Sequence, residues 1–253
     1  MLDWSQFRPA ESISLPDRIS IDIERLMLDG KLTEGDKLPS ERELASIFST
    51  SRVSLRQALR ELEIRGLIDR KPGRGTTILS RGHAASSESG QLANRLTKLE
   101  PEIAQIIEFR ALIEPPTAAL AATRATPRDI VQLEELLASM TTDISTDRYV
   151  ELDKAFHQAI SRSTYNPLLS AVSERLAHDV APVRDARMQS DQRRLNSMQE
   201  HEEILDAIRS HDSERAEIAA RFHIESISAE ISRRLNTADP SSATAEAIPP
   251  AQA

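Results

Sequence analysis

The stretch LPSERELASIFSTSRVSLRQ, residues 38–57, limits the fold of this chain most strongly, because it holds two helix starts separated by a short polar turn. Ser40, followed three residues later by Glu43, matches a capping box, in which the two residues satisfy each other's backbone N–H groups. The polar residues STS then interrupt the apolar period, and Ser51 begins a second helix. We therefore predict two helices joined by a tight turn.

The segment after Ser51 extends this arrangement. RVSLRQALRELEIRG has a helical apolar period that ends at Gly66. Its inward-facing residues are predicted to be Val53, Leu55, Ala58, Leu59 and Leu62. Residues 67–70 and 76–79 are predicted strands around KPGRG, whose proline and glycines suit the tip of a hairpin. Helix, turn, helix and hairpin is the order of a winged helix-turn-helix, whose second paired helix enters the major groove of DNA.

The distribution of charge agrees with this interpretation, although the whole chain has a net charge of −8. Residues 31–81 contain eleven Lys and Arg residues and seven Asp and Glu residues, a net charge of +4, which leaves −12 on the remainder. A basic segment inside an acidic chain indicates a local surface for an anionic partner. Net acidity therefore does not exclude nucleic acid.

Arginines follow the second helix start. Arg52 comes directly after Ser51 and Arg56 one turn later, so both project from the N-terminal end of the predicted recognition helix. Arginine suits forked contacts with guanine or phosphate, and N-terminal amides and serines suit phosphate. Arg74 stands between two glycines at the predicted wing tip. The alternative is that the helix arginines form ion pairs along the helix with Glu61 and Glu63.

The sequence GDKLPSERELASIFSTSRVSLRQALRELEIRGLIDRKPGRGTTI resembles the DNA-binding domain of GntR-type bacterial transcription regulators. The resemblance implies a winged helix-turn-helix and a double-stranded DNA operator as partner. The residues it assigns to DNA contact are Arg42, Thr50, Ser51, Arg52, Arg56, Gly73, Arg74 and Gly75. One departure is that Ser49-Thr50 replaces the usual Gly-Val, which removes the glycine best suited to a left-handed turn residue.

The rest of the chain is predicted to be a separate, all-helical bundle, so the fold class is mainly α. Residues 1–80 form the predicted DNA-binding domain, and the small polar residues 81–90 form a linker. Residues 91–236 have about six helices, and residues 237–253 have the composition of a disordered tail. Pro115-Pro116 is expected to bend or restart one helix.

Histidines in this bundle suggest a metal site. Asp153 and His157 are four residues apart and share one helical face, while His201 and His223 lie on two later amphipathic segments. A carboxylate with imidazoles suits a borderline divalent ion such as Zn²⁺, Ni²⁺ or Mn²⁺. The alternative is that each histidine is a half-buried polar residue at a helix junction, because spacing alone does not bring three helices together.

The patterns EFRALIEPPTAALAAT, D-x3-FH, H-x2-I-L-x2-I and a final histidine resemble the FCD ligand-binding domain of the FadR-like GntR subfamily. The resemblance implies a metal held by Asp153, His157, His201 and His223, and leaves His178 and His211 outside the site. Arg110 is a candidate clamp for a carboxylate effector, with Arg184 and Asn196 as further pocket candidates. The alternative for Arg110 is an ion pair with Glu108 or Glu114.

These features predict a homodimeric, metabolite-responsive transcription regulator, in particular a repressor, that senses a small carboxylic acid at a divalent-metal site and binds a pseudo-palindromic operator. It is predicted not to be an enzyme. A metal-dependent hydrolase and a regulator with a purely structural metal are the alternatives. The chain has no cysteine, which excludes thiolate ligands and nucleophiles. No signal peptide or membrane-spanning run is visible, so we expect a cytoplasmic protein.

Overall fold

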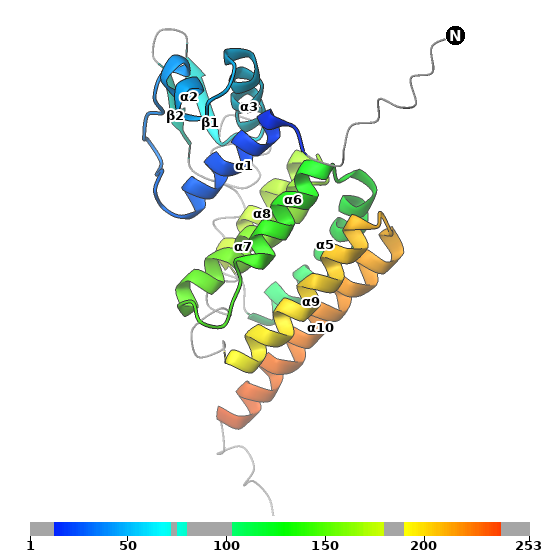
Figure 1. Ribbon diagram of the computed structural model, residues 1–253. Coiled ribbons are helices and arrows are strands. Elements are labelled where there is room, and N and C mark those ends of the chain that lie inside the picture. The colour runs from blue at the N-terminus through cyan, green and yellow to red at the C-terminus, as the bar shows by residue number, and fades with distance from the viewer. Residues whose placement is uncertain (1–12, 72–74, 80–102, 180–189, 239–253) are drawn as a thin grey trace, which may run out of the picture.

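The computed structural model describes residues 13–71, 75–79, 103–179 and 190–238, and most of them are helical. Figure 1 shows a smaller N-terminal unit, coloured blue to cyan, above a bundle of longer helices, coloured green to red. The predicted mainly α fold, a winged helix-turn-helix followed by an all-helical bundle, is therefore confirmed. The predicted linker 81–90 lies outside the described residues, as does the predicted tail beyond residue 238.

Three helices and a two-stranded sheet build the N-terminal unit. Its elements are α1 (Leu15–Leu28), α2 (Glu41–Ile47), α3 (Arg52–Ile64), β1 (Ile68–Lys71) and β2 (Gly75–Ile78). The strands are antiparallel, with Ile68 opposite Ile78 and Lys71 opposite Gly75. Ile19 and Ile23 of α1 pack with Leu55, Leu59 and Leu62 of α3 in one apolar core. The hairpin thus stands beside α3, as in a winged helix.

Both predicted helix starts are present. The Ser40 hydroxyl accepts from the Glu43 N–H, and the Glu43 carboxylate accepts from the Ser40 N–H, which completes the capping box. The Ser51 hydroxyl caps α3 by accepting a hydrogen bond from the Ser54 N–H. The prediction that Val53 faces inward was wrong, because its side chain is 77% exposed. Val53 lies in the first turn of α3, which projects beyond the apolar core of the unit.

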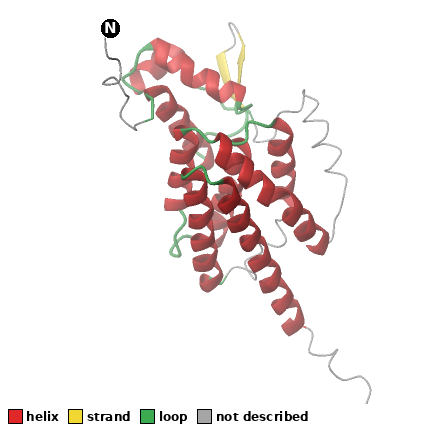
Figure 2. Cartoon of the chain, turned by 90° about the vertical axis from the view of Figure 1, so that its right-hand side faces the viewer, coloured by secondary structure: helices red, strands yellow, loops and turns green. Residues whose placement is uncertain are grey.

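Six helices in the described residues form the C-terminal bundle. They are α5 (Ile103–Arg124), α6 (Pro127–Ala138), α7 (Thr146–Arg162), α8 (Pro167–Asp179), α9 (Asp191–Arg209) and α10 (Ser213–Ala238). Phe156 of α7 and Ile208 of α9 are completely buried in the main core, where small alanines of α5 and α10 let the helices approach closely. Figure 2 shows the bundle from the side. None of the described helices is both long and apolar enough to cross a membrane.

The helix does not restart at Pro115-Pro116, since α5 runs from Ile103 to Arg124 with both prolines inside it, and the alternative expectation of a bend there stays a prediction. Each proline removes one backbone hydrogen bond from a helix interior. α5 nevertheless packs along α10, α9 and α7, and its residues Ala118, Ala121 and Ala122 are almost fully buried. Tertiary packing of this helix therefore outweighs the local cost of the prolines.

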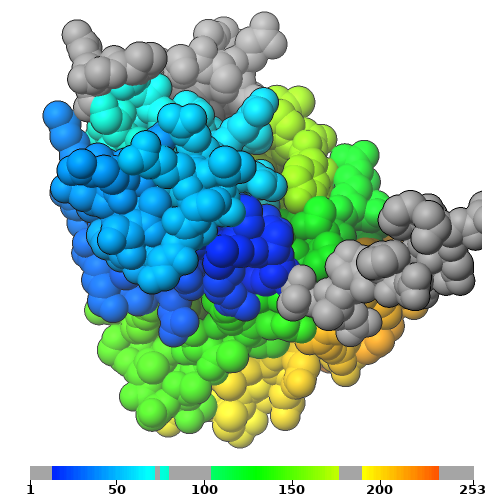
Figure 3. Space-filling model, turned by 45° about the horizontal axis from the view of Figure 1, so that its top comes forward, coloured from blue at the N-terminus to red at the C-terminus, as the bar shows by residue number. Residues whose placement is uncertain are grey.

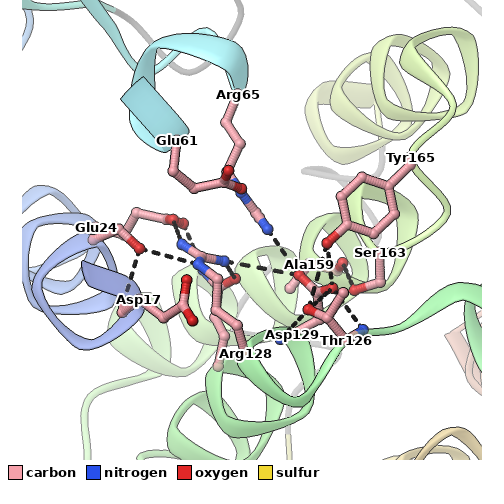
Figure 4. A network of polar contacts seen from close by, with 12 residues as sticks. Asp17, Glu24, Glu61, Arg65, Thr126, Arg128, Asp129, Ala159, Ser163 and Tyr165 are labelled. Atoms are coloured by element: carbon pink, nitrogen blue, oxygen red, sulfur yellow. Dashed lines mark hydrogen bonds and ion pairs between the residues drawn. The ribbon is translucent and has the colours of Figure 1, made fainter. Parts of the chain in front are cut away.

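A polar contact joins the two units, and we call Glu24, Arg65, Arg128 and Asp129 the interdomain contact. The Arg128 guanidinium of α6 bonds Glu24 and the Ser20 hydroxyl, both on α1. Arg65, at the end of α3, donates to Asp129 Oδ1 over 2.8 Å. Figure 4 shows these groups meeting between α1, α3 and α6, and Figure 3 shows the two units in direct surface contact. All four side chains are at least nine-tenths buried.

Candidate metal centre and DNA-facing surface

Three helices of the bundle bring the three predicted histidine ligands together, with Asp153 beside two of them. Asp153 and His157 come from α7, His201 from α9 and His223 from α10. All four lie on the helix faces that carry the apolar core residues, which explains how segments far apart in sequence meet. One potential ligand nitrogen from each histidine lies within 4.8 Å of those of the other two. Asp153 Oδ1 lies 3.6 Å from His201 Nε2 and 3.9 Å from His157 Nε2.

Each ring of the histidine cluster contributes a buried Nε2 atom. The Nε2 atoms of His157, His201 and His223 have no hydrogen-bond partner within the described part of the chain. Leaving such atoms unsatisfied costs about 1–3 kcal/mol each. A cation at the point where they converge would satisfy all three together, and the adjacent Asp153 carboxylate would supply negative charge. The donor set fits a four-coordinate or larger divalent-metal site.

Two carboxylates contact the opposite nitrogens of these rings. His223 Nδ1 lies 2.7 Å from Glu200 Oε2, and His157 Nδ1 lies 3.2 Å from Glu114 Oε2. An ionised carboxylate only accepts hydrogen bonds, so it favours the tautomer with the proton on Nδ1. That tautomer leaves the Nε2 lone pair available to a metal ion.

Burial keeps the imidazoles of His201 and His223 neutral. Burial, with the neighbouring histidines, lowers the pKa of His201 well below its ordinary value, and burial lowers the pKa of His223 to about 4. Burial alone would raise the pKa of Glu114, but the Arg110 charge and the His157 ring lower it well below the usual range. At neutral pH the rings of His201 and His223 are therefore uncharged, the protonation state that a histidine needs to bind a metal, and Glu114 is ionised.

Arg110, the predicted effector clamp, forms an ion pair with Glu114. It is only 2% exposed, and its Nε and one terminal nitrogen lie 2.6 and 3.2 Å from the two Glu114 oxygens. This is one of the ion pairs that the sequence left open as an alternative. Arg110 also lies close enough to Asp153 for that carboxylate to raise its pKa. The structure thus places Arg110 next to the histidine cluster, with Glu114 as its partner.

A small cavity of about 30 Å³ adjoins the histidine cluster. Its walls include His157, His223 and Glu114, together with the hydroxyl residues Thr117 and Ser161. Most of the remaining wall is apolar, from Ile113, Ala118, Ile160, Leu169, Leu176, Ile204 and Ala220. This combination of apolar surface and a few convergent polar groups is typical of a small-molecule site.

Of the other two predicted pocket residues, the structure describes only Asn196, which does not line the cavity. Asn196 is exposed, bonds Gln192 and lines a surface groove between α9 and α10 instead of the cavity. The reason is the helical period, because Asn196 lies five positions before the inward-facing His201 and therefore points to another side of α9. Arg184 lies outside the described residues. His211, placed outside the metal set by the sequence, bonds the Ala122 carbonyl through Nδ1 at 2.8 Å.

The predicted DNA-facing arginines lie on the surface of the N-terminal unit. Arg42 of α2 and Arg52 and Arg56 of α3 are all exposed. Arg56 Nε donates to Glu41 over 2.8 Å, and Glu41 also accepts from Arg70 of β1. Only the Nε atom of Arg56 donates to Glu41, which is the first residue of α2. This hydrogen bond therefore fixes the orientation of the Arg56 guanidinium relative to α2.

The smaller predicted contact residues differ in accessibility. Ser51 is exposed, but the Thr50 hydroxyl is buried and has no partner in the described residues. Gly75 is exposed with a φ of 87°, a left-handed conformation that favours glycine. Gly73 and Arg74, at the wing tip, lie outside the described residues.

The sequence indicated Glu114 only as an ion-pair partner of Arg110, and it did not indicate Glu200 or Arg193 as residues of the site. Arg193 lies seven residues before Glu200 on the inward face of α9, and its terminal nitrogens lie 3.3 and 3.2 Å from the Glu200 oxygens. The available signal was charge at positions of the helical period that are otherwise apolar. That signal indicates a buried ion pair, but it does not indicate that Glu200 also contacts His223.

Comparison with known proteins gave consistent matches over both units. Residues 15–78 match the family described as "Bacterial regulatory proteins, gntR family", and residues 105–226 match the FCD domain. The galactonate operon transcriptional repressor of Escherichia coli (strain K12) is 33% identical over 220 residues, 85% of this chain and 96% of that protein. The HTH-type transcriptional repressor NanR of Edwardsiella tarda (strain FL6-60) is 30% identical over 225 residues, 87% of this chain and 86% of that protein.

A third relative is named as an activator. The Glc operon transcriptional activator of Escherichia coli (strain K12) is 28% identical over 219 residues, which cover 83% of this chain and 85% of that protein. Proteins similar to this chain over more than four-fifths of its length thus include both repressors and an activator.

Proposed function

The chain belongs to the GntR family of bacterial regulatory proteins, which are DNA-binding transcription regulators and not enzymes, and from this premise we propose that it senses a small carboxylic acid. The acid would bind beside a divalent metal held by Asp153, His157, His201 and His223. Family membership removes the reason to consider a hydrolase. The proposal rests above all on the three converging Nε2 atoms, which have no partner in the described residues.

The charge of the centre supports an anionic effector. Three carboxylates, Asp153, Glu114 and Glu200, face two guanidinium groups, Arg110 and Arg193, so these groups carry −1 in total. A divalent ion would change this charge to +1, and a monocarboxylate would return it to zero. Because unbalanced charge is costly in a buried site, a singly charged acid fits better than a neutral ligand.

Arg110 would assist in holding the acid. When bound, the metal would supply an electrophilic position for one oxygen of the ligand. Arg110 is buried beside Glu114 and close to Asp153, so a change in its pairing would place a second cation next to the ligand. The hydroxyl groups of Thr117 and Ser161, in the cavity wall, donate to backbone carbonyls, so their oxygens would accept hydrogen bonds from the hydroxyl groups of a hydroxy acid.

The size of the cavity supplies a physical basis for switching. A volume of about 30 Å³ accommodates only a few atoms, so even a small hydroxy acid requires the surrounding helices to move. A ligand shifts an equilibrium only when it binds one arrangement better than the other. An acid that fits only the expanded cavity meets this requirement.

At the DNA, we propose a homodimer that places two copies of α3 in successive major grooves of a pseudo-palindromic operator. Arg42, Arg52 and Arg56 would make the principal contacts, with Ser51, Gly73, Arg74 and Gly75 at the helix start and wing. We propose repression as the output, because two of the similar proteins are named as repressors. The acid would then release or reinforce operator binding.

A thermal-shift screen tests the sensor proposal. Small hydroxy acids and sugar acids are added to the full-length protein with Zn²⁺, Ni²⁺, Mn²⁺ or no added metal. At least one carboxylate is expected to raise the melting temperature, and to do so only with metal. If no carboxylate shifts the metal-loaded protein, the carboxylate-sensor proposal fails.

The variant His201→Ala separates sensing from a purely structural metal. Loss of the ligand-induced shift, with the melting temperature of the metal-free protein retained, supports a sensing role. A large fall in melting temperature on loss of metal, without any effect of carboxylates on operator binding, supports a structural pin. His211→Ala is the matched control, since His211 lies in the same bundle but contacts a backbone carbonyl.

A further inference from the structure

Two of the three clustered histidines share the same arrangement, an arginine, a glutamate and a ring in series. On α10, the His223 ring contacts Glu200, which is held by Arg193. On α7, the His157 ring contacts Glu114, which is held by Arg110. The glutamate and arginine of each series come from a helix other than that of the ring, so each series ties two helices together.

Both carboxylates are gripped at two oxygens by buried guanidinium groups. The Arg110 distances are 2.6 and 3.2 Å, and the Arg193 distances are 3.3 and 3.2 Å. Arg193 also donates to the Ser226 hydroxyl of α10 over 2.9 Å. A forked pair of this kind fixes the plane of the carboxylate as well as its position. The plane of the carboxylate in turn fixes the direction of the bound imidazole.

We infer that Glu114 and Glu200 are positioning residues of the metal centre, each holding one imidazole with Nε2 toward the ion, and that Arg110 and Arg193 hold those glutamates in place. The inference rests on the proposed metal site. It adds that metal affinity depends on four residues that do not touch the ion. It also assigns Arg110 a structural task that is independent of any effector.

His201 provides an internal contrast. Its Nδ1, unlike those of His157 and His223, has no partner among the described residues. Its ring is held by packing, with the Phe156 ring 4.7 Å away between centroids. The two rings that lack such close support from a phenyl face are those that carry a carboxylate. The glutamates therefore supply an orientation that packing does not provide.

Loss of a group that orients a metal-bound histidine lowers metal affinity about 10–100-fold. We expect this loss of Zn²⁺ affinity for Glu200→Gln and for Glu114→Gln, measured in the full-length protein by competition with a chelating dye. Glu202→Gln is the matched control, because Glu202 lies on the same helix, exposed to solvent. Glu200→Asp is expected to recover part of the loss.

Imidazole NMR gives a readout that does not depend on bound metal. In the metal-free wild type, His157 and His223 are expected in the tautomer protonated on Nδ1, with slowly exchanging ring protons. Glu200→Gln should alter only the His223 signal, and Glu114→Gln only that of His157. A residue with a general structural role would instead disturb both rings and lower the melting temperature.

The double variant Arg193→Gln with Glu200→Gln removes the buried ion pair as a unit, which guards against misfolding caused by one uncompensated charge. It should show the same 10–100-fold loss of Zn²⁺ affinity. If the wild type binds Zn²⁺ while the glutamate variants bind it as tightly as Glu202→Gln, the positioning role is wrong and the metal site stands. If the wild type does not bind Zn²⁺ at all, the proposed metal site fails and the positioning role with it.

Discussion

At the scale of single residues, Ser49 shows how the turn between α2 and α3 tolerates an unusual side chain. Its φ of 49° lies in the left-handed region, where glycine is favoured and other residues are strained by about 1–2 kcal/mol. The sequence identified this position as the missing turn glycine. The turn keeps its geometry because the Thr50 N–H still bonds the Ala45 carbonyl at 2.9 Å.

We expect Ser49→Gly to stabilise the protein by about 0.5–1 kcal/mol, because relief of the backbone strain exceeds the added freedom of the unfolded chain. Urea titration measures the change. Ser46→Gly, the same substitution within the right-handed helix α2, should instead destabilise by a similar amount. Equal effects of the two substitutions would mean that Ser49 is not strained.

Arg52 is the residue on which DNA reading most depends in our proposal. Arg52→Ala should weaken operator binding by about 1–3 kcal/mol if Arg52 contacts a base edge, with a smaller effect on unrelated DNA. Fluorescence anisotropy at fixed salt measures both affinities. Arg221→Ala changes the net charge equally at an exposed site of the bundle and serves as control. An equal loss on both DNAs would assign Arg52 to phosphate, and no loss would remove it from the interface.

The sequence indicated the four predicted metal ligands, but it did not indicate which carboxylates contact the histidines among them. Asp153 and His157 share a face by their spacing, and the other two histidines came from the family resemblance. Glu200 pairs with His223 across two helices, whereas its neighbour in sequence, His201, has no carboxylate hydrogen-bonded to its ring among the residues that the structure describes. Such a contact depends on the relative rotation of α9 and α10, which core packing fixes and local spacing does not.

At the scale of elements, the first turn of α6 contains a residue with two structural roles. Asp129 completes a capping box with Thr126, and it also accepts hydrogen bonds from Arg65 and the Tyr165 hydroxyl. Burial alone would raise the pKa of Asp129, but Arg65 and the Thr126 groups lower it. The first turn of α6 therefore also binds the end of α3, through the ion pair between Asp129 and Arg65.

We expect Asp129→Asn to destabilise the protein by about 1–3 kcal/mol at pH 7, since the neutral amide still caps α6 but loses the ion pair. The folded-state pKa of Asp129 is lowered, so its stabilisation is full above the unfolded value near 4 and is lost as the pH falls through the folded value. Urea titrations at pH 7 and near pH 3 measure the difference.

The two proteins should therefore differ less in stability at pH 3 than at pH 7. Asp206→Asn is a suitable control, because Asp206 forms a solvent-exposed ion pair with Arg209 of the same helix, away from the DNA-binding unit. A pH-independent difference for Asp129→Asn would show that the carboxylate charge contributes nothing to the fastening of α3.

At the scale of the whole molecule, the order of the two units could be predicted but not how they join. Each unit has its own apolar core, so periodicity alone identifies both. The interdomain contact instead pairs polar residues more than sixty positions apart, such as Arg65 with Asp129. Nothing in the local pattern of either residue identifies its partner, because both also suit an exposed helix face.

The same geometry suggests how a signal in the bundle reaches the DNA-binding unit. Helix α7 carries Asp153 and His157, and near its start Arg148 donates to the Leu28 carbonyl at 2.9 Å and to Asp29 at 2.6 Å. Leu28 ends α1, which packs on α3, the helix proposed to read DNA. If the cavity expands around an acid, a shift of α7 therefore acts on α1 directly, in addition to any route through residues 81–90.

We expect Arg148→Gln to leave the metal and carboxylate affinities unchanged while reducing the effect of the carboxylate on operator binding at least about threefold, or about 0.7 kcal/mol of coupling free energy. Operator affinity is measured with and without the acid that gives the largest thermal shift. Arg209→Gln is the matched control, because it breaks an ion pair between Arg209 and Glu134, which are both residues of the bundle and make no contact with α1 through this pair. An undiminished response in Arg148→Gln would locate the coupling in the chain between the two units, whereas loss of acid binding itself would place Arg148 in the sensor.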